Sequence, residues 1–147
     1  MRSTQFELVD RLDEWFAERL DTLQCRGDTR AYVVGVMAKY RGPNDDLSRR
    51  SIVLEYVEAR QAGDFATYQR IGDWVLWSSV VHPDSFNGHH TVIETMGRMS
   101  YYACHRLMRS TWPVYEQLAD ELPDIARETR ELLSQRPIII GEFVRKQ

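Results

Sequence analysis

Apolar residues recur at steps of three and four through most of the chain, the spacing that places them on one face of an α-helix. From residue 4 to residue 23 this stripe consists of Leu8, Leu12, Trp15, Phe16, Leu20 and Leu23. A Thr4–Glu7 capping box marks the start of the segment, and Gly27 marks its end. The pattern therefore predicts a first helix over residues 4–23.

Glycines, prolines and capping residues divide the rest of the chain into further predicted helices. Asp28 and Asp64 suit helix starts, Gly63 suits a helix end, and Pro113 suits a first helical turn. Pro123 interrupts or kinks the last helical stretch. The predicted segments are residues 28–40, 47–62, 64–81, 89–109, 113–121 and 124–135.

Segment 64–81 is apolar over more than half of its circumference, so we expect it at the centre of the bundle. Pro83 ends it, because the residue before a proline avoids helical backbone, and residues 83–88 are predicted to form a loop. In segment 89–109, Gly97, Ser100 and Cys104 fall near one face. Their small size is expected to let a neighbouring helix approach closely.

The end of the chain has a different pattern from the rest. After Pro137 comes an apolar stretch rich in β-branched residues, which favours an extended conformation over a helix. We expect this tail either to pack back on the bundle or to pair with another subunit. The residues that would make this interaction are Ile138, Ile139, Ile140, Phe143 and Val144.

The fold class that follows is all-α: a single domain over residues 1–147, built as a bundle of six or seven helices. The helical core covers about residues 4–135, and the short extended tail covers residues 137–147. A chain of 147 residues with 43% apolar residues can bury a core without metals or disulfides.

Composition disfavours several classes of function. The net charge of −3 disfavours general nucleic-acid binding, which depends on a basic surface. Cys25 and Cys104 form no metal or redox motif and are expected to be reduced in a cytoplasmic protein. The N-terminus lacks the apolar region of a signal peptide, and no apolar stretch is long enough to span a membrane. The eight glycines form no phosphate-binding loop, and we expect no cofactor.

Metal binding has one candidate pair. His90 and Glu94 are four residues apart and could face the same way on a helix, but the chain has no Glu-x-x-His motif. His105 lies eleven residues beyond Glu94, too far along the same helix to join them. The alternative is that these side chains are solvated residues with no metal.

Asp73 stands out because it falls inside the segment predicted to be most buried. A buried charge needs a partner, for which Arg98, Arg106 or a tyrosine hydroxyl are candidates. One interpretation is a ligand pocket between segments 64–81 and 89–109. Its lining residues would be Asp73, Trp77, Tyr101 and His105. The other is that Asp73 lies on an exposed edge or forms a structural salt bridge.

Three blocks in sequence order resemble a family of uncharacterised bacterial all-helical proteins: residues 31–40, Arg70 to Trp77, and His82-Pro83-Asp84-Ser85-Phe86. Met96-Gly97, Tyr101-Tyr102 and the Tyr115–Ala119 stretch continue the resemblance. It spans roughly residues 25–135 and has no function attached to it. It implies one helical domain in which Gly72, Asp73 and Pro83 mark the fold.

The leading functional hypothesis is a non-enzymatic interaction or assembly protein that forms a homo-oligomer, based on the apolar tail and the abundant aromatic residues. The alternative is a small helical enzyme, or a protein that binds a small molecule or metal in the pocket described above. A third option, a DNA-binding regulator, would need a basic recognition helix, and segment 89–109 offers few basic residues.

Overall fold

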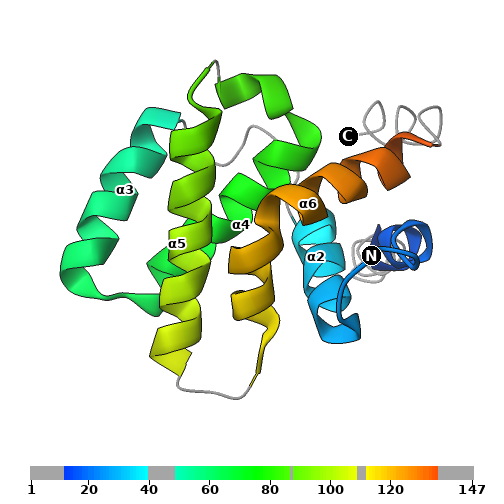
Figure 1. Ribbon diagram of the computed structural model, residues 1–147, viewed down its shortest axis with the longest axis horizontal. Helices are drawn as coiled ribbons and strands as arrows, with labels where there is room; N and C mark the ends of the chain where they lie inside the picture. The colour runs from blue at the N-terminus through cyan, green and yellow to red at the C-terminus, as the bar shows by residue number, and fades with distance from the viewer. Residues whose placement is uncertain (1–11, 40–48, 87, 109–111, 136–147) are drawn as a thin grey trace, which may run out of the picture.

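A computed structural model describes residues 12–39, 49–86, 88–108 and 112–135 of the chain (Figure 1). Residues 12–19 are helical and precede α2 (Gly27–Lys39), α3 (Arg49–Ala62) and α4 (Phe65–Val81). A short 3₁₀ helix, η1 (Pro83–Phe86), leads to α5 (His90–Met108) and α6 (Val114–Ser134). Strands are absent from the described ranges, and the predicted all-α class is confirmed.

Helix α4 lies at the centre of the bundle, as its pattern predicted. It packs against α2, α3, α5 and α6, and Figure 1 shows it crossing behind α5 and α6. Every residue from Ile71 to Ser78 is buried. Its sequence has apolar residues around most of the helix because neighbouring helices cover most of its surface.

Two glycines permit the close approach of α4 and α5. A Cβ atom at Gly97 of α5 would lie 2.6 Å from Cγ1 of Val75, and one at Gly72 of α4 would lie 2.7 Å from Cε1 of Tyr101. Ser100 and Cys104 are also fully buried. The predicted small-residue face of α5 is therefore confirmed, and Gly72 performs the same task on the facing helix.

The ends of α4 follow the predicted signals. The Asp64 side chain accepts a hydrogen bond from the backbone nitrogen of Ala66 at 3.0 Å, and Gly63 before it has a φ of +67°. The helix ends at Val81, just before the His82-Pro83 pair. Residues 83–86, predicted as loop, form η1 instead, because Phe86 is buried in the core and packs against Trp74.

The first helix ends earlier than predicted, at residue 19 rather than residue 23, and Gly27 begins α2 instead of ending the first helix. The reason lies in tertiary contacts of the connecting residues. The Gln24 backbone nitrogen donates to Glu128 Oε1 at 3.0 Å, and the Arg26 backbone nitrogen donates to Gln117 Oε1 at 3.1 Å. These side chains of α6 supply acceptors that a continued helix would have supplied internally.

Helix α6 joins the two predicted segments 113–121 and 124–135 into one kinked helix. The kink lies at Glu121, with φ −119° and ψ 16°, just before Pro123. Pro123 has no N–H for the carbonyl of Ala119, and the Arg98 side chain of α5 donates to that carbonyl at 2.7 Å instead. The kink was expected from the proline, but the compensating arginine was not.

Several predictions fall outside the described residues. They are the Thr4–Glu7 capping box, the start of the 47–62 segment and the C-terminal tail with Ile138, Ile139, Ile140, Phe143 and Val144. Within the described ranges, no helix is long and apolar enough to cross a bilayer.

Candidate functional site

The buried carboxylate of Asp73 is the centre of a polar network inside the core. Its Oδ1 atom accepts a hydrogen bond from the Tyr32 hydroxyl at 2.7 Å and another from the Tyr101 hydroxyl at 2.8 Å. Asp73 is only 6% exposed, and Tyr101 is fully buried. Three helices, α2, α4 and α5, therefore meet at one oxygen atom.

Burial raises the pKa of Asp73 above its ordinary value, because removal from water disfavours the charged form. The two tyrosine hydroxyls and the positive charge of Lys39 act in the opposite direction. Burial, followed by the charge and hydrogen bond of Asp73, raises the pKa of Tyr32. Tyr32 therefore stays protonated and remains a donor to Asp73.

A ring of aromatic side chains surrounds this network. Tyr115 of α6 stacks edge-on against Tyr32 at 5.4 Å between ring centroids, and its hydroxyl accepts a hydrogen bond from Gln69 at 2.7 Å. Trp112 continues the ring toward the surface, 5.6 Å from Tyr115. Edge-to-face contacts at these distances are typical of a packed aromatic cluster.

The structure brings together only two of the four predicted pocket residues, Asp73 and Tyr101. Trp77 is buried one turn further along α4 and packs against His82, at 5.4 Å between ring centroids. His105 lies one turn beyond Tyr101 on α5, where its Nε2 atom pairs with Glu116 Oε2 of α6 at 3.0 Å. The predicted arginine partners of Asp73 were wrong: Arg98 binds α6 carbonyls, and Arg106 is exposed.

The sequence predicted a tyrosine hydroxyl as one candidate partner of Asp73, but it identified neither Tyr32 nor the Gln69–Tyr115 hydrogen bond beside it. Tyr32, Gln69 and Tyr115 lie on three different helices, and their spacing in the sequence gives no sign that they meet. The only signal available was the general rule that a buried carboxylate requires donors. That rule predicted a tyrosine hydroxyl as one possible partner and could not say which one.

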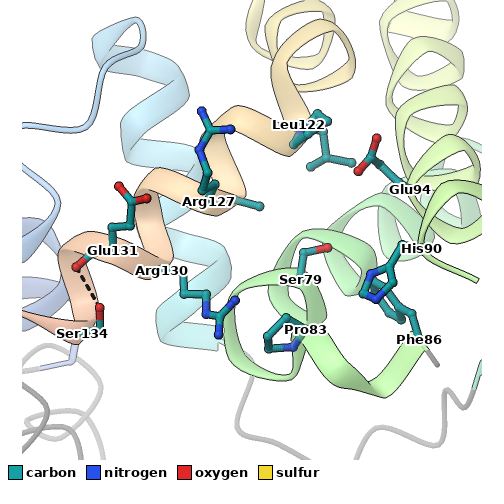
Figure 2. A pocket seen from close by; sticks show the side chains of 12 residues that line it. Ser79, Pro83, Phe86, His90, Glu94, Leu122, Arg127, Arg130, Glu131 and Ser134 are labelled. Atoms are coloured by element: carbon teal, nitrogen blue, oxygen red, sulfur yellow. Dashed lines mark hydrogen bonds between the residues drawn. The ribbon is translucent and has the colours of Figure 1, made fainter. Parts of the chain in front are cut away.

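A separate cleft lies between the second half of α6 and the junction of α4, η1 and α5 (Figure 2). We name it the α6 cleft. Its volume is about 440 Å³. Its walls include Ser79, Pro83, Phe86, His90, Glu94, Leu122 and Arg130. A second hollow of about 350 Å³ lies beside Tyr68, Ala103 and Leu107. Neither one is lined by Asp73, Trp77, Tyr101 or His105, so the predicted pocket stays a prediction.

His90 and Glu94, the candidate metal ligands, both line the α6 cleft. Among the residues that the structure describes, no three His, Cys, Asp or Glu side chains are grouped so that they could hold a metal ion. The pair therefore offers at most two protein ligands there, and metal binding by these residues stays a prediction.

Cys104 has none of the features of an activated nucleophile. It is fully buried, and burial raises the pKa of its thiol to about 12, with the nearby charge of Asp73 adding to the effect. The thiolate is the reactive form of cysteine, and at neutral pH this side chain is a thiol. Its burial fits the small-residue face of α5 that the sequence predicted.

The described surface carries exposed apolar side chains on two adjacent helices. On α3, Val53, Leu54 and Val57 are 38%, 59% and 49% exposed and lie on one side of the helix. On α5, which contacts α3, Val92 and Met99 are exposed and lie two turns apart. We name the three α3 residues the α3 stripe.

The comparisons with known proteins found no relative of this chain. No protein family, curated protein or solved structure matches this chain. The resemblance to a family of bacterial helical proteins therefore stays a prediction.

Proposed function

We propose that this chain is an interaction module that self-associates, with the α3 stripe at the centre of the interface. The observation that carries the proposal is the exposure of Val53, Leu54 and Val57 on one side of a helix whose opposite side is packed in the core. Isolated exposed apolar residues are common, whereas adjacent ones on a helix face are typical of interaction sites.

The partner in this proposal is a second copy of the chain. A two-fold axis lets one surface serve both partners, so the same apolar helix face of each copy can meet across the axis. A stable dimer buries about 800 Å² on each partner, which is more than three side chains provide. The neighbouring exposed residues Val92 and Met99 of α5 supply further apolar surface for the same interface.

The charges beside the stripe are compatible with this arrangement. Glu55 lies by helical spacing on the other side of α3, where it pairs with Arg70 of α4, so it brings no unpaired carboxylate to the interface. Glu58 and Arg60 of α3 are both exposed and lie on opposite sides of the stripe. The apolar tail, which is outside the described residues, is a second proposed contributor to self-association.

Sedimentation velocity over a range of protein concentrations tests the proposal. The full chain is expected to show a concentration-dependent dimer, and Leu54→Glu is expected to weaken it by about tenfold or more, because a charge would enter an apolar interface. Val81→Glu is the matched control, since Val81 is similarly exposed at the end of α4. It should leave dimerisation unchanged.

A chain truncated after residue 136 separates the tail from the stripe. If the truncated chain still dimerises and Leu54→Glu prevents dimerisation, the stripe forms the interface. If truncation alone abolishes the dimer and Leu54→Glu does not, the tail is responsible and the α3 proposal is wrong. A full chain that stays monomeric at the highest concentration refutes self-association altogether.

A further inference from the structure

The α6 cleft contains two opposite charges that have no ion-pair partner in the described part of the chain. Arg130 of α6 and Glu94 of α5 both line it, and neither forms a side-chain hydrogen bond or salt bridge there. Figure 2 shows them at separate places, with the Arg130 guanidinium beside Pro83 and the Glu94 carboxylate beside Leu122. Glu94 is half-buried.

The surface between these two charges includes several apolar side chains. Pro83, Phe86, Leu122 and Ala126 contribute carbon atoms to the walls, and the Ser79 side chain faces the cleft in Figure 2. The Ser79 hydroxyl already donates to the Val75 carbonyl at 2.7 Å, so its oxygen offers an acceptor. A cleft with apolar walls and a few separated polar groups is the usual form of a small-molecule site.

Two other charged residues of the cleft serve as an internal comparison. Arg127 pairs with Asp124 at 3.0 Å, and the side chains of Arg127 and Glu131 point away from the cleft in Figure 2. Arg127 has the same charge as Arg130, and Glu131 has the same charge as Glu94. Both Arg127 and Glu131 belong to α6. Of these four residues, Arg130 and Glu94 share two properties. Neither has an ion-pair partner in the described part of the chain, and both side chains are directed toward the apolar walls.

We propose that the α6 cleft binds a small zwitterion: a molecule with a carboxylate or similar anion at one end, an ammonium group at the other, and an apolar linker between them. Arg130 binds the anionic end, and a guanidinium suits this role because it can donate two parallel hydrogen bonds. Glu94 binds the ammonium end. The cleft volume of about 440 Å³ is within the range of known ligand pockets.

This ligand class follows from the separation of the two charges. A simple anion would satisfy Arg130 and leave the half-buried Glu94 carboxylate unpaired, with repulsion added. A simple cation would do the reverse. A zwitterion satisfies both, while its apolar linker covers Leu122 and Phe86. The inference is independent of self-association, because the cleft and the α3 stripe share no residue.

Nuclear magnetic resonance titration of the full ¹⁵N-labelled chain tests the proposal, with 6-aminohexanoate as the probe. Hexanoate and hexylammonium, which each lack one of the two charges, are the comparison compounds. The zwitterion is expected to shift amide signals of α6 and of the first turns of α5. Each comparison compound should bind about tenfold more weakly or worse, because it loses one charge-assisted contact.

Two pairs of variants assign the charges. Arg130→Gln should weaken the zwitterion about tenfold and leave hexylammonium unaffected, whereas Glu94→Gln should weaken the zwitterion and leave hexanoate unaffected or tighter. Arg127→Gln and Glu131→Gln are the matched controls and should change nothing. All four positions are at least partly exposed, and unchanged spectra elsewhere in the molecule confirm that each variant is folded.

Three results would overturn the proposal. The first is no shift at the α6 cleft at the highest probe concentration. The second is equal affinity for hexanoate and 6-aminohexanoate, which would indicate an anion site without a role for Glu94. The third is equal weakening by Arg127→Gln and Arg130→Gln, which would indicate non-specific attraction to the charges of α6.

Discussion

Gly72 and Gly35 are both glycines within helices, but alanine is expected to have opposite effects at the two positions. In α4, a Cβ at residue 72 would lie 2.7 to 2.9 Å from three atoms of the Tyr101 ring, where ordinary contacts begin at 3.4 Å. In α2, a Cβ at residue 35 would meet nothing within 4 Å. Helix propensity favours alanine by about 1 kcal/mol at both sites, so the surroundings decide the sign.

The Tyr101 ring has little room to move away from an added methyl group. It is fully buried, its hydroxyl is held by Asp73 at 2.8 Å, and Tyr32 and Tyr115 lie beside it at 6.3 and 6.0 Å between ring centroids. Overpacking of a core costs about 1–3 kcal/mol. Loss of a hydrogen bond to the buried carboxylate costs about 1–3 kcal/mol more. After the gain in propensity, Gly72→Ala should lower the free energy of unfolding by about 1–5 kcal/mol.

Gly35→Ala should instead raise the free energy of unfolding by about 0.5–1 kcal/mol, because alanine restricts the unfolded chain and clashes with nothing. Urea unfolding followed by far-UV circular dichroism, at one low protein concentration, measures both changes. Each kcal/mol should also shift Tm by about 2–4 °C for a chain of this size.

A second substitution tests whether the Tyr101 ring is the cause. In a Tyr101→Leu background the aromatic ring is absent, so the added cost of Gly72→Ala should shrink to less than half of its value in the native chain. If Gly72→Ala is as stable as the native protein, or if its cost is the same in both backgrounds, the steric argument is wrong.

Three further predictions concern the polar network and the cysteines. Because burial raises the pKa of Asp73, the folded state should lose stability as pH rises from about 4 toward that raised pKa. The Asp73→Asn variant lacks this loss, so in urea unfolding its stability relative to the native chain should increase over the same pH range. A stability difference between the two chains that does not change with pH would contradict the raised pKa. Tyr32→Phe should lower the free energy of unfolding by about 1–3 kcal/mol, and a neutral result would mean that Tyr101 alone satisfies the carboxylate. With a thiol-reactive disulfide reagent, half-buried Cys25 should react in the native protein and Cys104 only after unfolding; equal rates would show that Cys104 is accessible.

The sequence predicted the features of the fold that depend on neighbouring residues. The cap at Asp64, the stop at Gly63 and the end of α4 before Pro83 all depend on a few neighbouring residues, and all three are confirmed. The burial of α4 was also predictable, because a helix that is apolar on most sides must be surrounded. The face formed by Gly97, Ser100 and Cys104 followed from helical spacing alone.

Only the tertiary structure determined which distant residues meet. The two donors to Asp73 come from α2 and α5, and the donor to the carbonyl freed by Pro123 comes from α5. The placement of Arg130 and Glu94 on the walls of one cleft is likewise a product of packing between α5 and α6. Spacing along the chain fixes which face of a helix a residue occupies, because the helical repeat is constant. It does not fix the position of one helix against another, since that depends on how all the side chains between them pack.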